Sequence, residues 1–147
     1  MDDLDTKILN IIQTDGRASV KSIAEKCFIS APSASVRLQN LEDSGFIKEY
    51  SAEVDYEKLG YSIKAYIRID VSAKDKEKFV KTVQPIPNVT EVEMITGDAS
   101  MQVETYFKTM QDLNEFLLKL NNFGDTHTNI VFSTDLGPRP LNLENSK

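Results

Sequence analysis

The residues with the clearest chemical pattern follow Ser30 and lie on one predicted helix face. Intervals of three and four residues bring four of them to the same side: Ser33, Val36, Arg37 and Asn40. Arginine donates to guanine or to phosphate, asparagine pairs with adenine, and valine contacts the methyl group of thymine. The pattern favours a face that reads double-stranded DNA and leaves open an ordinary solvated face. The candidate DNA-binding residues are Ser30, Ser33, Val36, Arg37, Asn40 and Lys21.

The charge of the chain limits how it could hold nucleic acid. The 147 residues carry a formal net charge of −6, and residues 1–60 contain 7 Lys and Arg against 11 Asp and Glu. This balance argues against binding by bulk attraction to phosphates. Phosphate contacts must then come from individually placed cations, and the candidates are Lys21, Arg17, Lys26 and Lys48. For each of them, scattered surface charge without a binding role is the alternative.

Three predicted helices position this face. Apolar residues recur with helical spacing in residues 4–13, and Asp3 is the expected N-cap. Ser19 is expected to cap a second helix and Ser30 a third, after a very short connection. Residues 46–54 are rich in strand-forming residues. Three helices followed by an extended ribbon indicate a winged helix-turn-helix.

The pattern changes after residue 60. Residues 62–71 alternate between apolar and polar side chains, as a half-buried strand does. The same reading predicts helices over 74–84 and 110–120 and strands over 88–96, 101–107 and 126–134. The order β-α-β-β-α-β predicts a ferredoxin-like sheet with both helices on one face, so the chain is assigned to the α+β class.

Domain boundaries follow from these elements. We expect a DNA-binding domain over residues 1–52, a linker over 53–60, a ferredoxin-like domain over 61–136 and a loose tail over 137–147. The sheet face that carries Tyr66 and Arg68 needs a cover, which predicts self-association.

Other classes of protein find little support in the residues. Cys27 and His127 stand alone, and no convergent set suggests a catalytic centre, a metal site or a cofactor, so an enzyme is not expected. No stretch has the roughly 18 uninterrupted apolar residues of a membrane helix. The acidic start lacks a signal-peptide core, which predicts a cytoplasmic protein.

Several motifs taken together resemble the leucine-responsive regulator/AsnC (Lrp/AsnC) family of transcription regulators. They are LDTKILNIIQTDGRAS, the series R..LE..G.I..Y and the ITGD turn, and the likeness spans roughly residues 3–135. The resemblance implies a winged helix joined to a ferredoxin-like domain for effector binding and oligomerisation. It implies dimers that often assemble into octamers, and an amino-acid effector in many members.

The resemblance also implies an effector site. Backbone N–H groups at the loop beginning with Gly97 would hold a ligand carboxylate, and hydroxyl groups on the last strand would assist. The residues assigned to it are Gly97, Asp98, Ser100, Thr126 and Thr128. From the residues alone, Gly97 and Asp98 are equally compatible with a type I′ turn that simply joins two strands.

The sequence departs from the family pattern at three places. Phe28 stands where the helix-turn-helix turn usually has glycine, which predicts a more tightly packed turn. Gln39 and Asn40 replace two basic residues, which predicts weaker non-specific DNA affinity. The loop reads Gly97-Asp98-Ala99-Ser100 where the family commonly has a second aspartate, the natural partner of an α-ammonium group.

Two hypotheses follow. The first is an oligomeric, sequence-specific DNA-binding transcription regulator whose DNA affinity is tuned by a small molecule such as an amino acid. The second is an architectural protein that wraps or bridges DNA with little effector response, and the altered loop motivates it.

Overall fold

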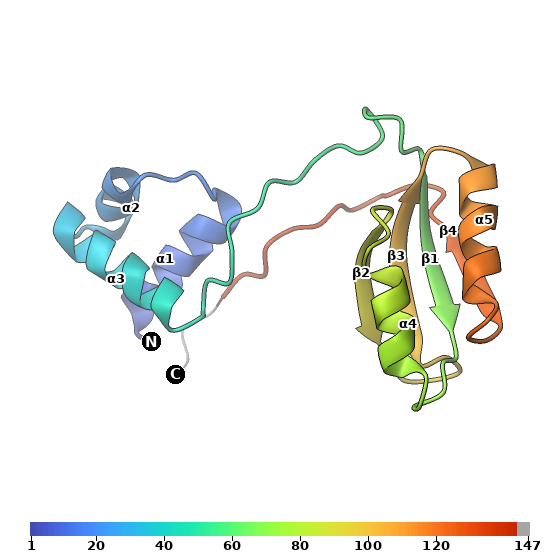
Figure 1. Ribbon diagram of the computed structural model, residues 1–147. Helices are drawn as coiled ribbons and strands as arrows, with labels where there is room; N and C mark the ends of the chain where they lie inside the picture. The colour runs from blue at the N-terminus through green and yellow to red at the C-terminus, as the bar shows by residue number, and fades with distance from the viewer. Residues whose placement is uncertain (144–147) are drawn as a thin grey trace. The chain divides into compact units, whose positions relative to one another are not determined.

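The computed structural model describes residues 1–143 and divides into two units (Figure 1). The helical unit consists of Met1–Glu53 together with the residues from Leu136 on, and the sheet unit of Val54–Asp135. The two units are described separately.

The helical unit contains α1 (Asp3–Thr14), α2 (Val20–Cys27) and α3 (Ala31–Asp43). The expected caps Ser19 and Ser30 are confirmed, since each side chain accepts a hydrogen bond from the backbone three residues on. The expected cap Asp3 is wrong by one residue, because Asp2 caps α1. Asp2 accepts from the backbone N–H of Asp5 and the Asp5 side chain accepts from that of Asp2, a reciprocal capping box.

Aliphatic side chains from all three helices form the core of this unit. The fully buried members are Ile8, Ile23 and Ala34, and Leu41 is 3% exposed. The expected ribbon over residues 46–54 is not a strand, although Ile47 packs against the core. The side chains of residues 48–54 are exposed in the single chain, and a strand requires a partner for its backbone hydrogen bonds.

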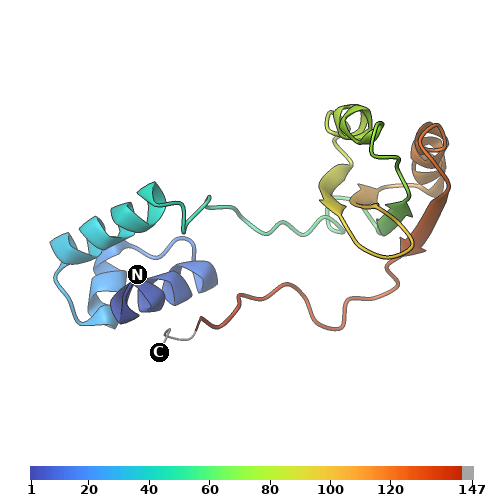
Figure 2. The same ribbon diagram turned by 90° about the horizontal axis from the view of Figure 1, so that it is seen from below.

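The sheet unit contains β1 (Ile63–Ile69), α4 (Lys76–Val83), β2 (Val89–Met94), β3 (Met101–Phe107), α5 (Met110–Leu120) and β4 (Thr126–Ile130). The strands form one antiparallel sheet in the order β2-β3-β1-β4. Both helices cover the same face of this sheet (Figure 2). The predicted ferredoxin-like arrangement is confirmed, with β4 ending at Ile130 rather than at residue 134.

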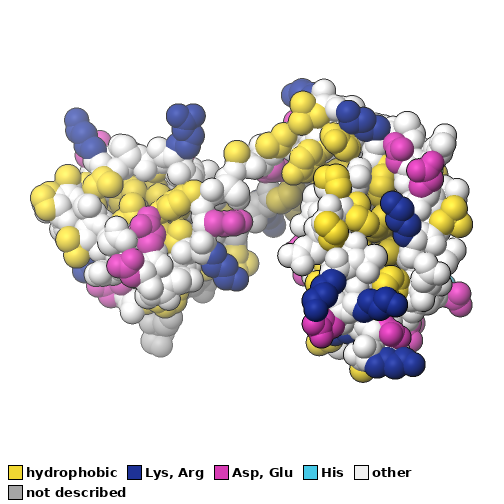
Figure 3. Space-filling model, in the orientation of Figure 1, with side chains coloured by type: hydrophobic (Ala, Val, Ile, Leu, Met, Phe, Trp, Pro, Cys, Tyr) yellow, Lys and Arg dark blue, Asp and Glu magenta, His cyan; other side chains and the backbone are white. Residues whose placement is uncertain are grey.

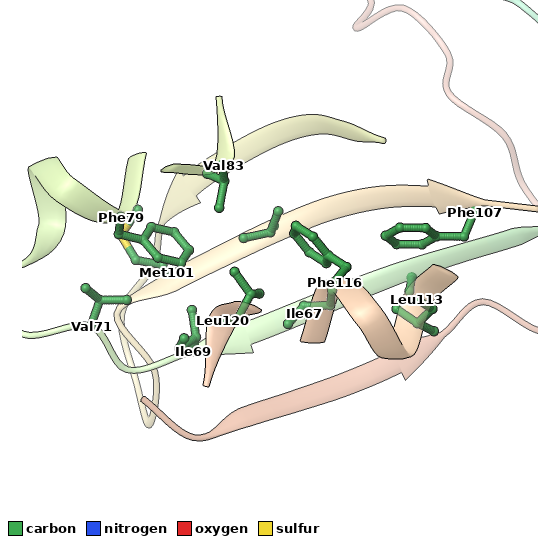
Figure 4. Packing of buried hydrophobic residues seen from close by; sticks show 12 residues of the cluster. Ile67, Ile69, Val71, Phe79, Val83, Met101, Phe107, Leu113, Phe116 and Leu120 are labelled. Atoms are coloured by element: carbon green, nitrogen blue, oxygen red, sulfur yellow. The ribbon is translucent and has the colours of Figure 1, made fainter. Parts of the chain in front are cut away.

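Alternation along the strands separates a buried face from an open one. The core joins strand residues such as Ile67 and Met101 to Phe79 of α4 and Phe116 of α5 (Figure 4). The opposite face carries Lys64, Tyr66 and Arg68 on β1, with Gln102, Glu104 and Tyr106 beside them on β3. No helix within the described residues is long and apolar enough to cross a membrane.

Candidate nucleic-acid interface

The predicted face of α3 lines one open groove on the helical unit. The groove has a volume of about 770 Å³ and is lined by Ser33, Val36, Arg37 and Asn40 together with residues of the N-terminus and Phe46. Val36 is 60% exposed, so its apolar side chain is accessible to a partner. The structure therefore brings four of the predicted residues to one accessible surface.

The two remaining predicted residues lie differently. The Ser30 hydroxyl accepts a hydrogen bond from the backbone N–H of Ser33 at 3.3 Å, so it defines where α3 begins. Lys21 is exposed near the start of α2 and does not line the groove.

Arg37 is engaged by two carboxylates that the sequence interpretation missed. Its Nη1 donates to both oxygens of Asp2, at 2.9 and 2.8 Å, and to Oδ1 of Asp5 at 2.7 Å. The Arg37 side chain is 29% exposed. The spacing of Asp2 and Asp5 is that of a capping box, but their contacts with Arg37 span 35 and 32 positions and have no local signal.

This cluster fixes the charge next to the groove. The pKa of the Asp2 carboxyl lies below its usual value, because the backbone N–H of Asp5 and then the Arg37 guanidinium donate to it. The Asp2 carboxylate is therefore ionised at neutral pH, and the formal charges of Asp2, Asp5 and Arg37 sum to −1. Arg37 has five N–H donors, so bonding through Nη1 leaves others for a ligand.

The surface as a whole is not strongly basic. Acidic and basic side chains are interspersed on the face of the helical unit that Figure 3 shows. This distribution agrees with the net charge of the sequence and is consistent with individual contacts rather than an electropositive surface.

Phe28 occupies the turn between α2 and α3 in an unexpected way. Its φ of 58° places it in the left-handed region that favours glycine, and it is the C-cap of α2. The prediction of a more tightly packed turn is wrong, because the Phe28 side chain is 87% exposed. The ammonium of Lys7 lies 5.2 Å from the ring centroid, which is within cation–π range.

The predicted effector residues gather at one end of the sheet unit. Strand β1 ends at Ile69, where Met101 follows the loop Gly97–Ser100 on one side and Thr126 of β4 lies on the other. Thr128 pairs with Ile67, two residues further along β4. The structure thus brings the loop and Thr126 to opposite flanks of the same strand end.

Two members of that set already have partners. Asp98 accepts a hydrogen bond from Arg68 at 3.0 Å, and the Ser100 hydroxyl accepts from the backbone N–H of Val71 at 2.7 Å. A type I′ turn is contradicted, since it requires positive φ at both central residues and Asp98 lacks it. Instead Ile95 donates to the carbonyl of Ser100 at 3.0 Å and closes a longer loop.

Family models account for both units. Residues 1–48 match a winged helix-turn-helix DNA-binding model, and residues 64–137 match the model of the Lrp/AsnC ligand-binding domain. The chain belongs to the Lrp/AsnC family. It is 34% identical over 137 residues to the HTH-type transcriptional regulator FL11 of Pyrococcus horikoshii, a match that covers 91% of each chain. It is 29% identical over 133 residues to LrpC of Bacillus subtilis, with 90% of this chain and 92% of LrpC covered.

Solved structures of the family agree with the fold. The structure of B. subtilis LrpC superposes with a TM-score of 0.86, at 29% identity, over 91% of this chain and 96% of that one. The complex of the Neisseria meningitidis regulator NMB0573 with L-Met superposes with a TM-score of 0.88, at 24% identity, over 93% of each chain. The resemblance inferred from the sequence is confirmed, and the chain is a helix-turn-helix DNA-binding transcription regulator of the Lrp/AsnC family.

Proposed function

We propose that this Lrp/AsnC regulator inserts α3 into the major groove of double-stranded DNA and reads bases with the residues that line its open groove. The observation that supports this most directly is the gathering of Ser33, Val36, Arg37 and Asn40 on one accessible surface next to a capped helix start. A side-chain carboxamide at Asn40 pairs with adenine, and Val36 contacts a thymine methyl. Ser33 and Lys21 bind phosphate oxygens.

Arg37 has a double role in this proposal. Through Nη1 it ties α3 to the start of α1, and through its remaining donors it contacts guanine or a phosphate. Substitution by alanine removes the contact and also leaves Asp2 and Asp5 without their cation beside the DNA. Arg37→Ala should therefore weaken DNA binding more than Asn40→Ala does, while the chain stays folded.

Footprinting of the full chain on genomic fragments identifies a site, and anisotropy titrations on that site test the residues. Asn40→Ala should weaken specific binding by about 5- to 150-fold, corresponding to the ~1–3 kcal/mol of a bidentate base contact. Asn114→Ala, an exposed asparagine of α5 in the sheet unit, is the matched control. Equal affinities of the folded Asn40 variant and the control would refute the proposed face.

Self-association belongs to the same proposal. The open face of the sheet carries Lys64, which lies 5.1 Å from the ring centroid of Tyr66 and 5.3 Å from that of Tyr106, with Glu104 bonded to it at 3.0 Å. A second copy of the chain covers this face and supplies a second α3, so that two half-sites are read together. Sedimentation of the full chain should show at least a dimer. A cytoplasmic location is part of the same proposal, because a transcription regulator must reach genomic DNA.

An amino acid is the proposed effector, bound at the end of β1 between the loop Gly97–Ser100 and Thr126. Its carboxylate would accept hydrogen bonds from backbone N–H groups, and Asp98 would receive its ammonium group in place of Arg68. The L-Met complex of the structurally similar N. meningitidis regulator supports this choice of ligand class. Because binding differs between two arrangements of the protein, the ligand shifts DNA affinity by that difference.

A second candidate function is an architectural protein without an effector. The pairing of Asp98 with Arg68 and of Ser100 with Val71 favours it, since an incoming ligand must displace existing bonds. Thermal denaturation with each of the twenty amino acids separates the two, because a ligand that binds the folded state raises Tm by mass action. A rise that Asp98→Asn abolishes supports the effector site, and no rise across the panel supports the architectural function.

A further inference from the structure

A second groove of the helical unit lies between α1 and the segment after α3. Its volume is about 890 Å³, and its apolar lining comes from Leu9, Ile12, Phe46, Ile47 and Tyr50, with Leu143 of the C-terminal segment among the lining residues. It shares Met1 and Phe46 with the DNA-facing groove but continues along α1 past Leu9 and Ile12. The C-terminal segment forms part of its wall through Leu143.

The C-terminal segment is held by its backbone. Asn10 Nδ2 donates to the carbonyl of Leu143 at 3.0 Å, and the N–H of Leu143 donates to Asn10 Oδ1 at 3.0 Å. One helical carboxamide thus satisfies both backbone groups of a residue, as a neighbouring strand would. One turn further along α1, Gln13 Nε2 donates to the carbonyl of Leu141 at 2.5 Å and to Asn10 Oδ1 at 2.9 Å.

The spacing of these contacts indicates that the C-terminal segment binds α1 as an extended peptide. Leu141 and Leu143 are two residues apart, so that in an extended chain their carbonyls point to the same side. Leu141 is 75% exposed, whereas Leu143 is half-buried in the groove. Pro138 and Pro140 precede the docked residues and restrict the chain before docking, which lowers the entropic cost of ordering it.

We propose that this groove is a docking site for the chain's own C-terminal segment, which makes the tail a second tether between the units. The first tether is the segment after α3, which enters the sheet unit at Val54; the second leaves it at Asp135 and ends on α1. Residues 131–140 connect the docked tail to β4, the strand that carries Thr126 and Thr128. In this proposal residues 131–140 link movement of β4 to α1, whose start holds Arg37 of α3.

A double-mutant cycle on the full chain tests the docking without any ligand. The variants are Asn10→Ala, a chain ended after Pro140, and both changes together, with hydrogen exchange of α1 and residues 46–51 as the readout. Each single change should speed exchange in this region several-fold, and Asn10→Ala should add nothing in the truncated chain once helix propensity at residue 10 is subtracted. Full additivity of the two changes would overturn the docking site.

Two controls keep this test specific. Asn114→Ala combined with the truncation should be additive, because Asn114 lies on α5 in the sheet unit. Leu143→Pro removes the N–H that donates to Asn10 while keeping the chain length, and it should reproduce the faster exchange. Normal exchange in a folded Leu143→Pro chain would contradict the backbone contact.

The regulatory part of the inference rests on the proposed DNA-binding function. Truncation after Pro140 should change the affinity for the footprinted site by at least a few-fold in anisotropy titrations. An unchanged DNA affinity together with a coupled exchange cycle would overturn the tether as a regulatory device. Loss of DNA binding by the intact chain would instead refute the proposed function, which the exchange cycle does not need.

Discussion

The two units of this chain differ in the size and composition of their apolar cores. Within the described residues, the core cluster of the sheet unit contains 12 buried side chains, among them Phe79, Phe107 and Phe116. The core cluster of the helical unit contains 7, which are aliphatic residues and one cysteine. Polar contacts supplement both cores: the ion pairs of Arg37 and the docked Leu143 in the helical unit, and the Lys64–Glu104 and Arg68–Asp98 pairs in the sheet unit.

This difference has a functional meaning. A large apolar core gives a rigid sheet, which suits the precise placement that the proposed effector site and oligomer interface require. A small core completed by polar contacts responds to its surroundings, because single hydrogen bonds and charges there form a larger share of the stability. Substitutions in the two units should therefore differ in their effects.

Phe79→Ala should have the largest effect. Phe79 is completely buried, and its ring lies 5.3 Å from that of Phe123. Removal of such a side chain costs about 3–5 kcal/mol of unfolding free energy. Denaturant unfolding should show this loss, while Phe132→Ala, which changes a fully exposed ring, should leave the midpoint almost unchanged. Similar losses for both would show that the ring of Phe79 is not a core element.

Gly124→Ala should destabilise the sheet unit to a smaller extent. A Cβ at this position would lie 2.6 Å from the carbonyl oxygen of Asp70, and the backbone φ is +158°. Strain of this kind costs on the order of 1–3 kcal/mol. Gly16→Ala in the helical unit is the control, because its nearest neighbour would be 3.9 Å away. A melting temperature of the Gly124 variant at or above that of the control would contradict the close approach.

Ser30→Ala should weaken the start of α3 by about 1 kcal/mol, the usual value of an N-cap. Ser35→Ala, on an exposed turn of the same helix, should be neutral or slightly stabilising. Hydrogen exchange of the first turn of α3 measures the difference. If both serine variants exchange alike, Ser30 contributes nothing as a cap, and a contact with DNA would be its remaining role.

Asp2→Asn should have the smallest effect, and it should strengthen DNA binding rather than weaken the protein. Asparagine keeps the cap of α1 but removes one negative charge beside the groove. DNA binding should become tighter by roughly 2- to 5-fold at low salt, and the gain should shrink as salt screens it. Asp3→Asn makes the same charge change without a bond to Arg37. Weaker binding by the Asp2 variant would mean that orientation of Arg37 outweighs repulsion of the DNA.

Local patterns predicted the elements of both units well. The caps Ser19 and Ser30, the alternation around Ile67 and the order of strands and helices depend on neighbours in the sequence, and the structure confirms them. The expected cap Asp3 was wrong because Asp2, not Asp3, forms the reciprocal capping box with Asp5. The predicted strand over residues 46–54 was wrong because a strand needs a neighbouring strand for its backbone hydrogen bonds, and strand-forming residues alone do not provide one.

Patterns along the chain were enough to predict the helix-turn-helix, the ferredoxin-like order and the residues that share one face of α3, since periodicity and capping act within a few residues. The long-range pairs emerge only in the folded chain: Arg37 with Asp2 and Asp5, Asp98 with Arg68, and Asn10 with Leu143. These pairs lie 30 to 133 positions apart. The packing of the chain brings these partners together. Contacts between residues so far apart produce no periodic pattern in the sequence.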